Sequence, residues 1–236
     1  MLNCYNVVLT SSRRFTEENT TFVTKYLLDF HAQNDSSIYP LKLYENDQIT
    51  SNISPDFINL LKNTYPSLEI TDEKAFYYIV GLLSSNVYFE KYKEQMRQDF
   101  PHVVLVKDAQ TFEKVAELGK KLVDEMAGFD ELELPPTFSI ETNIEKIPDA
   151  KIQMIYDENT KTLYLNKDKT LWIKGIDKDV WEFKQGNFDV IRNWIVSRKG
   201  LVFDAEMKHS FAVVCYAIKR YLELRKELDK VLEGKI

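Results

Sequence analysis

Short apolar and alternating segments characterise the first fifty residues of the chain. Residues 5–10 (YNVVLT) are rich in β-branched and aromatic side chains, which is typical of a β-strand. Residues 22–28 (FVTKYLL) fit a second strand or a short helix, and apolar and polar residues alternate at 38–44 (IYPLKLY). Because Pro40 cannot donate a hydrogen bond to a sheet ladder, we expect an edge strand or an extended segment there.

Helical patterns begin at Ser54. Ser54 and Pro55 form a typical helix start, in which a capping residue precedes proline at the first helical position. Thr71 is expected to cap the next helix, because acidic residues follow it in the first turn. That helix is apolar on nearly every side, which favours a central, buried position. Gly119, in the last helix of this group, indicates a close contact with another helix. The four predicted helices span about 57–65, 74–85, 87–99 and 111–126, and residues 103–106 (VVLV) fit a strand or an extended core segment.

The rest of the chain begins with an acidic stretch at 127–149, which contains Pro135 and Pro136 and is predicted to be a connector. The elements that follow are three short strands, a helical turn, an amphipathic helix and a long last helix, at 151–157, 162–166, 171–174, 177–181, 189–197 and 204–233. This pattern predicts an α+β fold, with a helical lobe, small antiparallel sheets and a long C-terminal helix. We expect two lobes, about 1–126 and 150–236, on either side of the acidic connector.

The composition fits a folded protein with a substantial core, because 44% of the 236 residues are apolar and 13% are aromatic. The net charge of -6 counts against nucleic acid as a partner, since phosphate contacts require Lys and Arg. The charge is unevenly distributed, however: residues 124–149 contain eight acids and one base, whereas residues 161–199 contain nine bases and five acids. One face could therefore still meet phosphate, although ordinary solvated charge explains the same pattern.

Known catalytic and metal-binding signatures are absent from the sequence. It contains no P-loop, dinucleotide-binding glycine loop, GxSxG or HExxH motif, and its two cysteines form no CxxC pair. Residues 134–138 (LPPTF) resemble the polar-Pro-Pro-aromatic motif of amino-methyltransferases, but Leu134 stands at the polar position, so we interpret them as a connector turn. No apolar run reaches the roughly 20 residues of a membrane span, and the N-terminal charges follow the apolar stretch, so we expect a cytoplasmic protein.

Several segments of the chain together resemble one known family. They are a tyrosine-rich helix that leads into a DFP stretch, a helix with an LG pair, and a block with two tryptophans followed by a basic turn, at 77–106, 112–124 and 180–200. The opening of the chain matches as well, at 6–14, 22–29, 39–45 and 52–54. In this order the segments resemble the C-terminal specificity region of type ISP restriction-modification enzymes and related single-chain adenine methyltransferases.

The resemblance implies a DNA target recognition domain that is not catalytic by itself. Its partners would be double-stranded DNA and methyltransferase, helicase or nuclease domains, in cis or in trans. No cofactor is expected in this chain, because S-adenosylmethionine would bind to the methyltransferase domain, which flips an adenine and methylates N6. The chain would be either a fragment of a larger polypeptide or a stand-alone specificity protein. The alternatives are an adaptor that docks onto methyltransferase or helicase domains and a hydrolase that uses scattered carboxylates.

The candidate DNA-contacting residues are those on predicted loops and polar strand ends whose side chains suit bases or phosphates. Direct readout uses Arg or Lys for guanine, Asn or Gln for adenine, and Ser or Thr as adaptable donors. Base contacts are expected from Ser11, Ser12, Arg13 and Arg14 and, around a glycine, from Lys184, Gln185 and Asn187. Phosphate contacts are expected from Lys167, Lys169, Lys174, Arg198 and Lys199. Ordinary solvated charge is the alternative for each of them.

The aromatic residues that carry the resemblance are expected to pack the core and the lobes, because aromatic stripes at helical spacing are usually buried. They are Tyr77, Tyr78, Tyr88, Tyr92, Phe100, Trp181, Phe183 and Trp194. The family signature therefore predicts the scaffold more than the DNA contacts.

Overall fold

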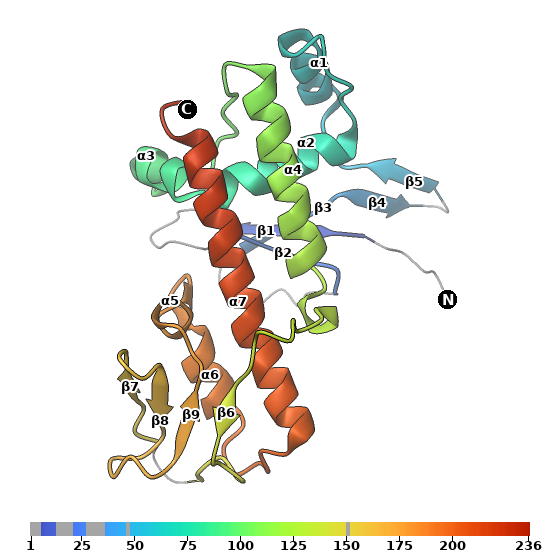
Figure 1. Ribbon diagram of the computed structural model, residues 1–236. Coiled ribbons are helices and arrows are strands. Elements are labelled where there is room, and N and C mark those ends of the chain that lie inside the picture. The colour runs from blue at the N-terminus through green and yellow to red at the C-terminus, as the bar shows by residue number, and fades with distance from the viewer. Residues whose placement is uncertain (1–5, 13–20, 27–35, 46–47, 150–151) are drawn as a thin grey trace. The chain divides into compact units, whose positions relative to one another are not determined.

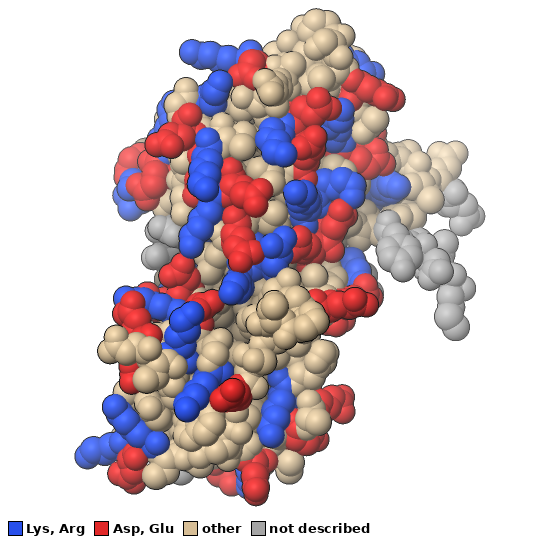
Figure 2. All heavy atoms as spheres, viewed as in Figure 1, with Lys and Arg blue, Asp and Glu red and all other residues tan. Residues whose placement is uncertain are grey.

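The computed structural model describes residues 6–12, 21–26, 36–45, 48–149 and 152–236 of the chain. It contains two compact units (Figure 1): unit 1 comprises Met1–Gly128 and Glu223–Ile236, and unit 2 comprises Phe129–Leu222. The last helix, α7 (Ala205–Leu232), begins in unit 2 and ends in unit 1. Each unit combines helices with small antiparallel sheets, so the predicted α+β fold and long C-terminal helix are confirmed. Acidic and basic side chains are interspersed on the face drawn in Figure 2.

Two small antiparallel sheets lie in unit 1. Their strands are β1 (Val8–Ser12), β2 (Phe22–Thr24) and β3 (Ser36–Pro40) in the order β2-β1-β3, and β4 (Lys42–Glu45) with β5 (Gln48–Ser51). The single segment predicted at 38–44 is therefore two strands. They separate at Leu41, which buries its side chain and donates its backbone N–H to the Val7 carbonyl at 2.9 Å. Pro40 ends an edge strand, as its missing N–H requires.

Four helices follow these sheets in unit 1. They are α1 (Pro55–Thr64), α2 (Asp72–Leu83), α3 (Asn86–Met96) and α4 (Ala109–Met126). The predicted cap of α2 is present, because the Thr71 hydroxyl accepts a hydrogen bond from the Lys74 backbone N–H at 3.1 Å. The Asp108 carboxylate caps α4 in the same way. A methyl group on Gly119 would collide with the Tyr77 carbonyl oxygen of α2, so the predicted close helix contact is confirmed.

Three buried tyrosines bond the segment 102–106 to these helices. The Tyr65 hydroxyl donates to the Val106 carbonyl (2.6 Å), that of Tyr78 to the Val104 carbonyl (2.7 Å) and that of Tyr88 to the His102 carbonyl (2.7 Å). The segment is extended without being a strand, because side chains satisfy its carbonyls. The predicted core positions of Tyr78 and Tyr88 are confirmed, since they are 0% and 1% exposed.

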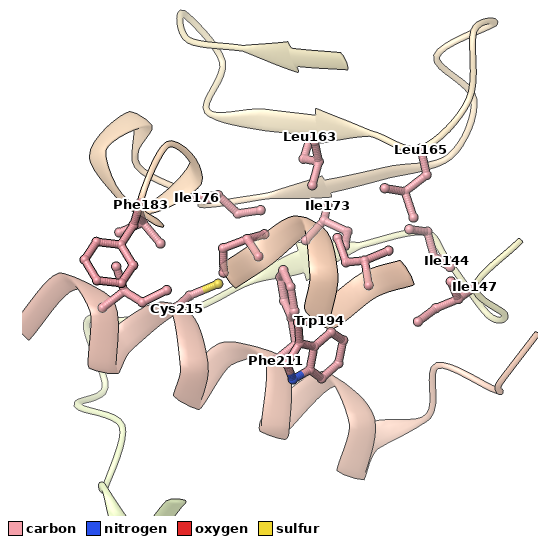
Figure 3. Close-up of a cluster of buried hydrophobic side chains, with 14 of the residues drawn as sticks. Ile144, Ile147, Leu163, Leu165, Ile173, Ile176, Phe183, Trp194, Phe211 and Cys215 are labelled. Atoms are coloured by element: carbon pink, nitrogen blue, oxygen red, sulfur yellow. The ribbon is translucent and has the colours of Figure 1, made fainter. Parts of the chain in front are cut away.

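Unit 2 is built on one four-stranded antiparallel sheet in the order β6-β9-β8-β7. The strands are β6 (Glu141–Thr142), β7 (Ile155–Asp157), β8 (Thr162–Tyr164) and β9 (Trp172–Lys174). The further elements are α5 (Lys178–Trp181), β10 (Lys184–Gln185), β11 (Phe188–Asp189), α6 (Val190–Val196) and the first part of α7. The core lies between the sheet and the helices, where Leu163 and Ile173 meet Trp194 and Phe211 (Figure 3). Trp194 is buried, as predicted.

The acidic segment 127–149 contributes most of its length to unit 2. It contains a 3₁₀ helix, η1 (Phe129–Glu131), and the edge strand β6, which pairs with β9. Ile144 and Ile147 are each 1% exposed in the core of this unit, and the Ile147 N–H donates to the Leu201 carbonyl at 3.0 Å. The predicted division into lobes 1–126 and 150–236 treats these residues as a connector, whereas here they supply a strand and two core side chains.

Candidate nucleic-acid interface

Two of the predicted phosphate-contacting lysines lie in the loop that joins β8 to β9. Lys167 and Lys169 are exposed in this loop, residues 166–170, and Lys169 adopts a left-handed conformation with φ of 57°. Asn166 fixes the loop, because its side-chain oxygen accepts hydrogen bonds from the backbone N–H groups of Thr170 (3.0 Å) and Leu171 (3.1 Å). The loop therefore presents both lysines from an ordered turn rather than from a structureless segment.

The outer face of the unit 2 sheet carries Lys174 and two aromatic rings. Leu163 and Ile173 point into the core, so the alternation of side chains puts Tyr164, Trp172 and Lys174 on the opposite face. The Lys174 Nζ atom lies 4.5 Å from the Trp172 ring centroid, and the Lys169 Nζ atom lies 5.3 Å from that of Tyr164. Aromatic rings and cations together suit contacts with nucleic acid.

The three lysines of this hairpin, Lys167, Lys169 and Lys174, form no ion pair with a carboxylate in the described part of the chain. Several other lysines of unit 2 form ion pairs with carboxylates. The Asp177 carboxylate, for example, forms ion pairs with the Nζ atoms of both Lys161 (2.6 Å) and Lys219 (3.2 Å). Hydrogen bonding from Lys161 is the main cause that lowers the pKa of Asp177 below its usual value. The charge of the hairpin lysines is thus available to a phosphate.

Arg198 and Lys199 lie in the turn after α6. The Arg198 guanidinium stacks on Trp194, 4.0 Å from its ring centroid, and donates to the Trp194 carbonyl at 3.1 Å and to the Ser197 hydroxyl at 3.0 Å. Arg198 therefore covers a core ring and completes the end of a helix. Lys199 is exposed and lacks an ion-pair partner among the described residues.

The second predicted base-reading segment forms a tight hairpin. Lys184 pairs with Asp189 and Gln185 with Phe188, so that only Gly186 and Asn187 form the turn. Gly186 has φ of 55°, the left-handed conformation that the first position of such a turn requires. Asn187 is exposed at the tip, and the Lys184 Nζ atom lies 3.8 Å from an Asp189 carboxylate oxygen.

Within unit 2, the structure separates the lysine loop from the β10–β11 hairpin. Figure 3 places Leu165, which precedes the lysine loop, and Phe183, which precedes the β10–β11 hairpin, at opposite ends of the unit 2 core. Ser11 and Ser12 belong to β1 in unit 1, and Ser11 is only 2% exposed. Arg13 and Arg14 lie outside the described residues, so their role stays a prediction.

Three aromatic residues at these surfaces were not predicted as contacts: Tyr164, Trp172 and Phe188. The signal for the first two is their position beside lysines on short strands, and the signal for Phe188 is its place directly after a Gly-Asn turn. Phe188 is 57% exposed, which is unusual for a phenylalanine.

Among the residues that the structure describes, no group of three or more His, Cys, Asp or Glu side chains could hold a metal ion. No helix in those same ranges is both long and apolar enough to cross a membrane.

Comparisons with known proteins identify both a family and a fold. The family model of the Type ISP C-terminal specificity domain matches residues 1–222, whereas no curated protein matches the sequence. One similar solved structure is the ATP-dependent Type ISP restriction-modification enzyme LlaBIII bound to DNA, with 22% identity and a TM-score of 0.72 over 96% of this chain. A nuclease-deletion mutant of the Type ISP enzyme LlaGI in complex with a DNA substrate mimic has 22% identity and a TM-score of 0.65 over 95%. The DrdV–DNA complex has 18% identity and a TM-score of 0.76 over 95%.

This chain spans only a small part of those three proteins. It covers 16% of the LlaBIII chain, 18% of the LlaGI chain and 24% of the DrdV chain. The similarity therefore shows that this chain has the fold of one region of each of these proteins.

Proposed function

Since the chain belongs to the family of Type ISP C-terminal specificity domains, we propose that it recognises the DNA target sequence of a restriction-modification enzyme. The observation that carries this proposal is the family match over residues 1–222. The DNA-bound state of the similar structures supports it. The adaptor function has no comparable observation in its favour.

In this proposal, one hairpin of unit 2 contacts phosphates and another contacts bases. The lysines of the β8–β9 hairpin suit phosphates, because their charge is not neutralised by a described carboxylate and a phosphate contact needs no exact geometry. The β10–β11 hairpin suits bases, because it presents an exposed amide at Asn187 on a narrow two-stranded ribbon, which fits the major groove.

We propose further that catalysis belongs to other domains of the enzyme. An adenine-specific methyltransferase domain would bind S-adenosylmethionine, and helicase and nuclease domains would act on DNA that carries the recognised sequence. These domains are expected in cis or in trans, and a DNA-directed enzyme of this kind would act in the cytoplasm.

The test is a binding experiment with the full chain. Duplexes are selected from a randomised pool, and the dissociation constants of the selected and a scrambled duplex are measured at several salt concentrations. The wild-type chain should prefer the selected duplex by at least about tenfold at fixed salt. Equal binding of all duplexes would contradict the proposed function.

The same assay tests the phosphate role of Lys174. Lys174→Ala should weaken binding to both duplexes alike and lower the salt slope by about 1, because a phosphate contact carries no base information. The control is Lys114→Ala, which removes an exposed lysine of α4 that pairs with Glu117 at 3.0 Å and should leave the slope unchanged. A loss confined to the selected duplex would instead make Lys174 a base contact.

A further inference from the structure

The exposed ring of Phe188 has no structural role that the fold explains. The side chain is 57% exposed. Phe188 follows the turn residue Asn187 directly and lies two residues before the start of α6. The preceding aromatic of the same hairpin segment, Phe183, is 9% exposed and belongs to the core of unit 2. The phenylalanine just before the hairpin is therefore buried, whereas the one within the hairpin is exposed to solvent.

The hairpin holds Phe188 in a defined place. At its base, the Val190 N–H donates to the Phe183 carbonyl at 3.4 Å, and the Asn193 side-chain amide donates to the Asp189 carbonyl at 2.9 Å. The next core residue, Ile191, is 0% exposed. A ring on an anchored hairpin loses little conformational freedom on binding, which favours its use as a contact.

Asn187 supplies a complementary group one residue away. Its side chain is exposed at the tip of the hairpin and hydrogen-bonds no other described residue. An asparagine amide can bond the N6 and N7 atoms of adenine, and an apolar side chain can contact the C5-methyl group of thymine. Both edges are accessible in the major groove, where the methyl group distinguishes A·T from T·A pairs.

We infer that the β10–β11 hairpin recognises an A·T pair in the major groove, with Asn187 bonded to the adenine edge and the Phe188 ring packed on a thymine methyl group. This inference rests on the proposed function and adds to it the type of base pair and the two residues that recognise it. Phe188 is thereby a specificity-determining residue.

The test removes the methyl group from the DNA and the ring from the protein. Each thymine of the selected duplex is replaced in turn by deoxyuridine, which pairs identically but lacks the C5-methyl group. At one position the wild-type chain should bind about fourfold more weakly, the effect expected for one buried methyl group. Phe188→Ala should bind the thymine duplex more weakly and respond to that deoxyuridine by less than about 1.5-fold.

Two further variants serve as controls for Phe188→Ala. Phe188→Leu keeps an apolar side chain and should retain part of the deoxyuridine effect. Val202→Ala alters another exposed apolar residue of unit 2, at 62% exposure, and should retain all of it. Equal melting temperatures of the variants would show that each is folded.

The outcomes separate the inference from the proposed function. The inference is wrong if the wild-type chain selects a sequence but no deoxyuridine weakens its binding, or if Phe188→Ala keeps the full effect. Those results leave sequence recognition intact and show that the Phe188 ring does not contact a thymine methyl group. If the wild-type chain selects no sequence, the proposed function fails and the inference with it.

Discussion

Tyrosine hydroxyls replace a sheet ladder in unit 1. The carbonyls of His102, Val104 and Val106 alternate along an extended segment, and each accepts a hydrogen bond from a different tyrosine. The Tyr78 hydroxyl also accepts from the buried Val106 N–H at 3.2 Å, so it satisfies two backbone groups at once. Two of these tyrosines, Tyr78 and Tyr88, carry the family resemblance, and they bond the extended segment to the helices.

Tyr78→Phe should lower the free energy of unfolding by about 1–3 kcal/mol, because it removes the partner of the buried Val106 N–H and of the part-buried Val104 carbonyl while the ring stays in place. Urea denaturation followed by circular dichroism measures the change. The matched control is Tyr77→Phe in the same helix, whose hydroxyl bonds no described residue and which should change stability by less than about 0.5 kcal/mol. Equal effects of both variants would show that the bonds to segment 102–106 contribute nothing.

Helices α2 and α4 pack at a distance that only glycine allows. A methyl group on Gly81 would lie 2.6 Å from the Val115 carbonyl oxygen, and one on Gly119 would collide with the Tyr77 carbonyl oxygen. Backbone therefore faces backbone where the two helices meet, and no side-chain rotation could relieve an added carbon atom. The two helices are therefore closely packed against each other.

Gly119→Ala should destabilise the protein by about 1–3 kcal/mol, although alanine is normally the better helix former. The clash with the Tyr77 carbonyl outweighs the gain in helix propensity, which is about 1 kcal/mol. Thermal unfolding provides the measurement. Lys121→Ala, at an exposed position of α4, is the control and should be nearly neutral. A stabilised Gly119→Ala variant would mean that the two helices can separate without cost.

The helices and the short strands of unit 2 could be predicted because their signals are local. The cap at Thr71 and the close contact at Gly119 follow from residue type and spacing alone. The break at Leu41 could not be predicted, since it depends on a hydrogen bond to Val7 in another strand.

The candidate site was predictable only as separate segments. The sequence predicts loops for Lys167 and Lys169 and for the polar residues 184–187. The structure places both lysines in a loop, whereas Lys184 and Gln185 form β10 and only Gly186 and Asn187 form the turn. That these turns lie at opposite ends of one core depends on the sheet order β6-β9-β8-β7, which no local pattern contains. The exposure of Phe188 is likewise a tertiary property, because an aromatic residue before an amphipathic helix is usually buried.

The two units differ in the aromatic residues that report on their folding. All three tryptophans, Trp172, Trp181 and Trp194, lie in unit 2, whereas the tyrosines that bond segment 102–106 lie in unit 1. Each unit has buried apolar side chains of its own. Tryptophan fluorescence therefore follows the unfolding of unit 2, and far-ultraviolet circular dichroism follows the helices of both.

Raising the pH from about 8 to about 11 should lower the urea midpoint measured by circular dichroism more than the midpoint measured by tryptophan fluorescence. Burial raises the pKa of Tyr65 to about 12 and also raises the pKa values of Tyr78 and Tyr88. An unfolded phenol has a pKa of about 10, so the folded state favours the neutral form. That stabilisation is complete below about pH 10 and is lost as the pH rises from there through the folded values.

The urea midpoint of unit 2 should also fall as the pH rises, but by less than that of unit 1. Burial raises the pKa of its Tyr156 to about 12, and its exposed lysine pairs contribute little to stability. Tyr78→Phe is the control, because it removes one of the buried phenols of unit 1 and should reduce the shift seen by circular dichroism while leaving the fluorescence shift unchanged. Midpoints that coincide at every pH would show that the two units unfold as one, since α7 belongs to both.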